Sequence, residues 1–128
     1  KGLVTESIRG DDLYIMVDVC NYSLTYSLFG MTNHMSPDDH FQDLKRVIAA
    51  AAGKAHRINV IMPFLYESRQ HRRSGRESLD CAIALQELVN MGVDNIITDN
   101  PVLVRKVMNR ESETETGFWE LMKYALRI

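Results

Sequence analysis

A cluster of cationic side chains follows an apolar run near the middle of the chain. Four arginines and a histidine fall within eight residues, as Arg69, His71, Arg72, Arg73 and Arg76. The guanidinium group presents a rigid fork of donors that matches phosphate oxygens, so a loop of this composition suits a polyphosphate ligand. The alternative is a solvated charged loop without a ligand, and composition alone favours that alternative.

The apolar run before the cluster is expected to position it. Residues 58–63 are mostly apolar and β-branched, which indicates a buried strand. In open parallel α/β sheets, ligands bind beyond the carboxyl ends of the strands. The sequence therefore predicts an anion site where this strand enters the basic loop.

Two further segments have the pattern of strands, and one does not. The nearly continuous apolar run at 13–20 predicts a central strand covered on both faces. Residues 95–98 predict a third, shorter strand. Residues 21–35 mix small, polar and aromatic side chains, and we interpret them as a loop with at most a short helical turn.

Two helices are predicted between these strands. Ser36 and Pro37 have the residue types of an N-cap and a first helical position, and the helix should end near Gly53. The broad apolar face of 78–91 predicts a second helix, with Gly92 as its C-terminal left-handed residue. Strand-helix-strand units of this kind build parallel sheets.

Histidine and aspartate side chains in the first half of the chain are candidates for metal ligands. Asp38, Asp39 and His40 adjoin one another, but two carboxylates at a helix start are explained by capping and by the helix dipole. His34 has no second ligand at a suitable spacing and is interpreted as a surface residue. We therefore predict no metal site.

Length, charge and cysteine content exclude several classes of protein. A chain of 128 residues with a formal charge of -2 fits one modest domain and gives no basic field for nucleic acid. No apolar run reaches the roughly 20 residues that span a bilayer. Cys20 and Cys81, which form no CxxC pair, favour reduced thiols and a cytoplasmic location.

Residues 63–73, Pro-Phe-Leu-Tyr-Glu-Ser-Arg-Gln-His-Arg-Arg, resemble the strand and loop of ribose-phosphate pyrophosphokinases, the synthetases of phosphoribosyl pyrophosphate. The likeness covers about residues 3–98 and includes the family's Glu-x-x-Arg-Gly-x-Asp pattern at 6–12. It implies an α/β, three-layer Rossmann-like fold with a phosphoribosyltransferase-like parallel sheet and flanking helices. It also implies Mg-ATP as the ligand and pyrophosphoryl transfer to ribose 5-phosphate. The ATP- or phosphate-binding residues implied are Arg69, Gln70, Arg72 and Arg73.

The sequence departs from this family at its reactive centre. The family carries a catalytic histidine just after its third strand, whereas no histidine follows Thr98 here. The family's adenine-contacting segment and ribose-phosphate loop have no counterpart in these residues, and His71 replaces a common acidic residue. The resemblance thus implies an incomplete synthetase-like domain with at most weak ATP or phosphate binding and no catalytic residue.

The last part of the chain resembles a second family. Residues 92–128 are similar to the final strand and helix of glycerophosphodiester phosphodiesterases, so the chain reads as a mosaic joined near Thr98. We expect an α/β domain at 1–98 and a helical extension at 99–128. A natural fusion, an engineered recombinant and a mis-assembled reading frame would each leave this pattern.

Other functions stay open beside nucleotide binding. The chain could be a non-catalytic structural chimera, a fragment related to the phosphodiesterases, or a scaffold that associates with itself. An unpaired sheet edge invites strand addition, so a homo-oligomer is one expectation. No nucleic-acid or membrane partner is expected.

Overall fold

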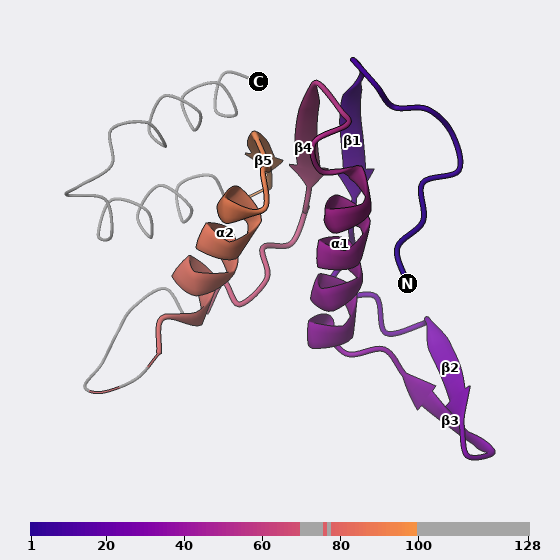
Figure 1. Cartoon of the computed structure of the whole chain (residues 1–128). Coiled ribbons are helices and arrows are strands. Elements are labelled where there is room, and N and C mark those ends of the chain that lie inside the picture. Colours follow the sequence, from indigo (N-terminus) through magenta and orange to yellow (C-terminus); the bar gives the residue numbers. More distant parts are fainter. Residues whose placement is uncertain (70–75, 77, 100–128) are drawn as a thin grey trace.

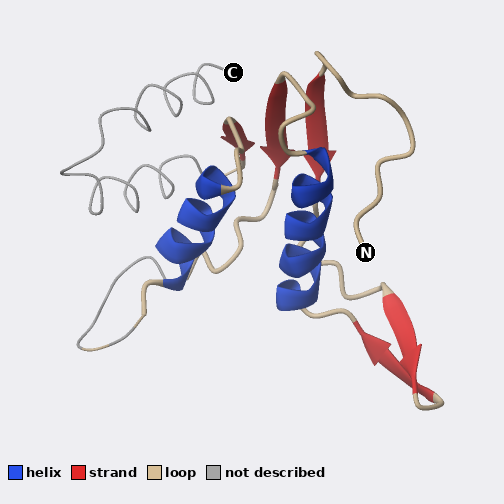
Figure 2. Cartoon of the chain, viewed as in Figure 1, coloured by secondary structure: helices blue, strands red, loops and turns tan. Residues whose placement is uncertain are grey.

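The computed structural model describes residues 1–69, 76 and 78–99. Among the described residues, three strands form one sheet with two helices against it, and a separate hairpin extends away from this body (Figure 1). Figure 2 shows the same separation of helices and strands. In chain order the elements are β1 (Asp12–Met16), β2 (Thr25–Leu28), β3 (Met31–His34), α1 (Pro37–Ala51), β4 (Arg57–Ile61), α2 (Asp80–Asn90) and β5 (Asn95–Ile97).

The main sheet has the order β1-β4-β5, and both neighbouring pairs are parallel. Its register places Val60 opposite Ile15 on one side and Ile96 on the other. A helix of each strand-helix-strand unit crosses between neighbouring strands, as parallel pairing requires. The predicted fold class, α/β with a parallel sheet and flanking helices, is confirmed.

The strand predicted at 13–20 is confirmed at Asp12–Met16, but its predicted length and central place are wrong. The strand ends at Met16. A turn follows it, in which Asp18 Oδ1 accepts a hydrogen bond from the Cys20 backbone N–H at 3.0 Å. β1 is an edge of the described sheet, and its Tyr14 and Met16 are 59% and 71% exposed. A run of apolar residues does not distinguish an edge strand from a central one, and β4 takes the central place.

The core lies between the sheet and the two helices. Ile48 of α1, Val60 of β4 and Leu88 of α2 are completely buried within it. Its other members in these elements come from the apolar positions of the predicted helices and strands, namely Phe41, Leu44, Ala51, Ile58, Cys81, Ala82, Ala84, Leu85 and Ile96. Both predicted helices are therefore confirmed, and Gly92 follows α2 with the expected positive φ of 95°.

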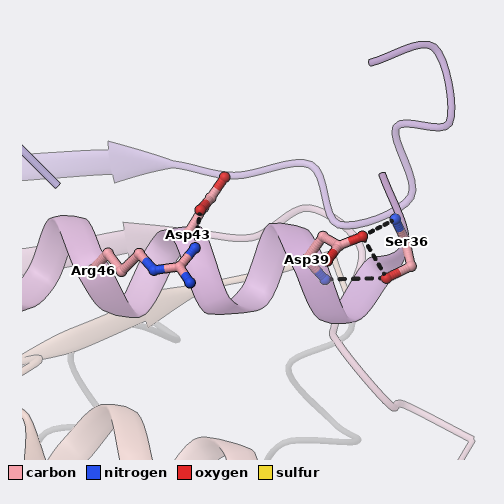
Figure 3. Close-up of polar contacts among 4 residues, drawn as sticks. All are labelled: Ser36, Asp39, Asp43 and Arg46. Atoms are coloured by element: carbon pink, nitrogen blue, oxygen red, sulfur yellow. Dashed lines mark hydrogen bonds and ion pairs between the residues drawn. The ribbon is translucent and has the colours of Figure 1, made fainter. Parts of the chain in front are cut away.

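A reciprocal cap starts α1. The Ser36 hydroxyl accepts a hydrogen bond from the Asp39 backbone N–H at 3.2 Å, and Asp39 Oδ2 accepts from the Ser36 backbone N–H at 2.9 Å (Figure 3). This capping box satisfies two helix-terminal donors that would otherwise lack partners. The capping interpretation of Asp39 is confirmed.

The cap is expected to stabilise the fold less at acid pH than at neutral pH. Hydrogen bonds from the Ser36 backbone, and then from its hydroxyl, hold the pKa of Asp39 below its ordinary value of 3.8. Asp39 therefore stabilises the fold fully above the unfolded-state pKa, and this contribution is lost as the pH falls through the lower folded-state pKa. We expect the gap in unfolding free energy between wild type and Asp39→Asn, measured by urea titration, to shrink below a pH of about 4.

The neighbouring carboxylate provides the control. Asp43 lies one turn further along α1 and pairs with Arg46 at 2.7 Å, outside the cap. A gap that stays constant from neutral to acid pH for Asp39→Asn, or that narrows equally for Asp43→Asn, would contradict the prediction.

The prediction that residues 21–35 form a loop is also wrong. β2 and β3 pair antiparallel, with Tyr26 opposite Asn33 and Leu28 opposite Met31. Phe29 and Gly30 connect them with φ of 52° and 75°, the double positive φ of a type I′ turn. The usual sequence of that turn is Asn-Gly. Because this chain has Phe-Gly, the sequence did not predict the turn.

The histidines near this hairpin serve structural contacts. His34 stacks on Tyr22 with ring centroids 4.0 Å apart, and its Nδ1 lies 2.7 Å from the Tyr22 carbonyl oxygen. His40 is buried, with Nε2 2.7 Å from the Asn21 carbonyl oxygen. No group of three or more potential metal ligands gathers within the described residues. The predicted helical extension at 99–128 lies, apart from Asp99, outside them.

Candidate functional site

The carboxyl ends of β4 and β5 form one hydrogen-bonded edge. Beyond the last register pair, the Met62 backbone N–H donates to the Ile97 carbonyl at 2.8 Å. The Pro63 carbonyl then accepts from the Asp99 backbone N–H at 3.2 Å and from Thr98 Oγ1 at 3.3 Å. The segment that leads into the basic loop therefore starts from a fixed position.

A compact turn follows Pro63. Leu65 is buried in the core, and its carbonyl accepts a hydrogen bond from the Ser68 backbone N–H at 3.2 Å. Glu67 has a positive φ of 54°, a conformation that is uncommon for a residue with a side chain. The buried Leu65 and this reversal direct the chain outward, and Arg69 at its end is exposed.

Tyr66 links this turn to the start of α1. Its ring stacks on Phe41 at a centroid distance of 4.3 Å and an interplanar angle of 3°. Its hydroxyl donates to Asp38 Oδ1 at 2.5 Å. Burial, followed by this hydrogen bond to the Asp38 carboxylate, raises the pKa of Tyr66, so the phenol stays protonated and acts as a donor.

An ion pair joins the two helices. Lys45 Nζ lies 2.9 Å from Glu87 Oε2 and 5.3 Å from the centroid of the Phe41 ring. The ion pair connects α1 with α2, and the ammonium group of Lys45 also lies over the Phe41 ring. Phe41 thus contacts both Tyr66 of the turn and the Lys45 side chain of this ion pair.

The predicted site residues fall at the limit of what the structure describes. Arg69 is exposed and pairs with no carboxylate among the described residues, so its guanidinium faces solvent at the predicted edge of the sheet. Arg76 is exposed as well. Gln70, Arg72 and Arg73 lie outside the described residues, and whether they converge with Arg69 stays a prediction.

A hollow in the described structure lies elsewhere. It has a volume of about 260 Å³ and is bounded by the base of the hairpin and the outer side of α1. Its lining residues are Tyr26, Met35, Asp39, Gln42, Asp43 and Arg46. It is therefore separate from the turn that carries Arg69.

Sequence reasoning missed the contacts that hold the turn. Tyr66 and Asp38 are 28 positions apart, and neither belongs to a spacing pattern that would indicate a bond between them. The nearest available signal was the aspartate pair at the start of α1, which we interpreted as helix capping. Asp39 serves that purpose, whereas Asp38 receives the Tyr66 hydroxyl.

Residues 2–92 match the family model described as the N-terminal domain of ribose phosphate pyrophosphokinase. The chain belongs to this family. The match contains β1, the hairpin, both helices, β4 and the whole basic loop, and it ends just before β5. The resemblance seen in the sequence at 63–73 is thereby confirmed at the level of the family.

Named relatives agree with this assignment. The chain is 33% identical over 96 residues to a Streptococcus pneumoniae protein assigned as ribose-phosphate pyrophosphokinase 2, covering 74% of this chain and 26% of that protein. It is 28% identical over 98 residues to ribose-phosphate pyrophosphokinase B of Dictyostelium discoideum, covering 75% and 26% of the two chains. The chain thus spans about a quarter of the length of the curated relatives it matches.

No helix among the described residues combines the length and the apolar character needed to cross a bilayer. α1 has 15 residues and carries charged side chains along its exposed side.

Proposed function

We propose that the loop beyond β4 binds the phosphate groups of Mg-ATP through Arg69, Gln70, Arg72 and Arg73. The observation that carries the proposal is that Arg69, in the loop beyond the central parallel strand, is exposed and pairs with no carboxylate among the described residues, within a family named for a pyrophosphokinase reaction. Guanidinium forks match phosphate oxygens, and the amide of Gln70 supplies one further donor.

The reaction proposed for the complete family fold is pyrophosphoryl transfer from ATP to ribose 5-phosphate, which gives phosphoribosyl pyrophosphate and AMP. Magnesium would offset the charge of the triphosphate, and the arginines would stabilise the charge that develops during transfer. The proposed binding groups belong to the loop at 69–73, but no histidine follows Thr98 in the sequence. We therefore propose that the 128 residues bind ATP weakly and do not turn it over by themselves.

Calorimetric titration with Mg-ATP tests the binding step. A charge-assisted hydrogen bond contributes about 1.5–3 kcal/mol, so we expect Arg69→Ala to weaken binding by about 10- to 100-fold. The matched control is Arg57→Ala, which removes another exposed arginine side chain, at the start of β4. It should leave the dissociation constant unchanged.

Three results would contradict the proposal. They are the absence of heat with wild-type protein, an unchanged affinity in Arg69→Ala, and an equal loss in Arg57→Ala. Adenosine in place of ATP separates the phosphate contacts from those to the base, because the proposed residues recognise phosphate. Formation of AMP from Mg-ATP and ribose 5-phosphate by this chain alone would contradict the proposed lack of turnover.

A separate proposal concerns the chain beyond β5. The likeness of residues 92–128 to the end of glycerophosphodiester phosphodiesterases supports a division into an α/β domain at 1–98 and a helical extension at 99–128. In this proposal the extension is structural, because that family's metal carboxylates and catalytic histidines belong to barrel strands with no counterpart here.

A further inference from the structure

Three groups of Tyr66 hold the turn that precedes Arg69. The ring stacks on Phe41 at 4.3 Å, the hydroxyl donates to Asp38 Oδ1 at 2.5 Å, and the backbone N–H donates to Met62 Sδ at 3.3 Å. The first two contacts join the loop after β4 to the start of α1. Only two residues separate Tyr66 from Arg69, so a rotation of the turn at Tyr66 changes the direction in which Arg69 leaves it.

The turn itself contains a backbone conformation that a free loop rarely adopts. Glu67 has a φ of 54°, in the left-handed region that is unfavourable for a residue with a long side chain. Strained backbone of this kind persists only where the surrounding structure over-determines it, and it is found preferentially at ligand sites. The burial of Leu65 and the bond from the Ser68 N–H hold the turn from within, and the contacts of Tyr66 with α1 add a constraint from outside.

The hydroxyl bond is the part of this arrangement that packing does not require. Phenylalanine at this position would make the same stack on Phe41, and Asp38 is exposed, so water can replace the phenol at its carboxylate. Burial, followed by the bond to Asp38, raises the pKa of Tyr66, so the phenol remains the donor at neutral pH. A hydrogen bond to a charged acceptor is stronger than a neutral one and adds directional restraint. It therefore restricts the turn beyond what the stack alone achieves.

We propose that Tyr66 and Asp38 are positioning residues for the phosphate contact of Arg69. Their hydrogen bond ties the strained turn to α1 and thereby fixes the direction in which Arg69 leaves the turn. This inference rests on the proposed binding of phosphate by Arg69, and it adds that the affinity depends on two side chains that do not contact the ligand. Such preorganisation strengthens binding because the binding group is ordered during folding and not at the moment of association.

NMR titration of isotope-labelled protein with Mg-ATP, a method that follows weak binding, tests the proposal. We expect Tyr66→Phe to weaken binding by about 3- to 10-fold, because it removes the charge-assisted bond and keeps the stack on Phe41. Asp38→Ala should weaken binding to the same extent, whereas Asp38→Asn keeps an oxygen that accepts the phenol hydrogen and should bind at least as well as wild type. The matched controls are Tyr14→Phe on β1 and Asp43→Ala on α1, which should leave the dissociation constant unchanged.

A double variant separates positioning from a general effect on stability. If the pair acts through Arg69, Tyr66→Phe should cause no further loss of affinity in an Arg69→Ala background. The backbone order parameters of Ser68 and Arg69, measured without nucleotide, should be lower in Tyr66→Phe than in wild type. The order parameter of Lys54, beyond the far end of α1, should not change.

The results distinguish this inference from the proposed function. If Arg69→Ala weakens binding and Tyr66→Phe does not, the positioning role is overturned and the phosphate site stands. Additive losses in the double variant, or a loss in Tyr14→Phe equal to that in Tyr66→Phe, would overturn the positioning role as well. If wild-type protein binds no Mg-ATP, the proposed function fails, and the order parameters then decide whether the pair fixes the turn, since unchanged values would overturn that role too.

Discussion

We expect Ile48→Ala to lower the free energy of unfolding by about 2–5 kcal/mol. Ile48 is completely buried on the side of α1 that packs into the core with Val60 and Leu88. Truncation removes its transfer free energy and leaves a cavity that neighbouring secondary structure can fill only in part. Since small domains have only about 5–15 kcal/mol of stability, the variant should unfold at a much lower urea concentration.

The matched control is Ile83→Ala on α2. The chemical change is identical, but this isoleucine is 51% exposed and alanine has the better helix propensity. We expect a loss below about 1 kcal/mol, because half of the side chain is solvated before truncation. Equal losses at the two positions would show that the core does not lie between α1 and the sheet.

The second large effect is expected at Asn59, a polar residue buried in the central strand. Its Nδ2 donates to the Leu13 carbonyl of β1 at 3.2 Å, and its Oδ1 accepts from Asn95 Nδ2 of β5 at 2.7 Å. One side chain therefore connects all three strands. Asn59→Leu keeps the branched shape, although its methyl groups are larger, and leaves the Asn95 amide and the Leu13 carbonyl without this partner, at a cost of about 1–3 kcal/mol for each unpaired group. Urea unfolding measures the loss.

Replacing both asparagines is the decisive comparison. When each partner of a buried hydrogen bond becomes apolar, no donor is left unpaired, and the cost can fall close to zero. We therefore expect the double variant Asn59→Leu with Asn95→Leu to be more stable than the sum of the two single losses predicts. Strict additivity would show that the 2.7 Å contact contributes nothing to stability.

Much of the main body was predictable because its patterns are local. The capping residues Ser36 and Asp39 lie at the start of α1, and Gly92 lies just beyond the C-cap of α2. The buried strand at β4 carries its apolar residues without interruption except at Asn59, as a strand covered on both faces requires. The order of strands and helices along the chain then indicated the parallel sheet.

The two errors have different physical origins: the first lay in tertiary packing and the second in local turn chemistry. The run from Leu13 to Cys20 is apolar except at Asp18, and its place at the edge of the described sheet explains the exposure of Tyr14 and Met16. The alternation of side chains in the hairpin was present in the sequence. Its turn, however, uses Phe29 where asparagine is the usual signal.

The place of the basic loop along the chain was predictable, but the contacts that hold the turn before it were not. The sequence predicted a basic loop after a buried strand, and in the structure Arg69 follows the central strand β4 and is exposed, while its role in a site stays a prediction. The supports of the turn are the Tyr66 bond to Asp38 and the stack on Phe41, and these contacts join residues that are distant in sequence. No pattern of residue spacing in one sequence predicts contacts between such distant residues.

The carbonyl of Pro63 has a consequence for how the edge of the sheet responds to a ligand. It receives both Thr98 Oγ1 and the Asp99 N–H, so the entrance of the basic loop and the residue after β5 belong to one hydrogen-bonded unit. A displacement of the loop entrance must stretch or break the bond from Asp99. An amide exchanges its hydrogen with solvent only when that bond opens, so the exchange rate at Asp99 is an intrinsic gauge of loop position that requires no introduced label.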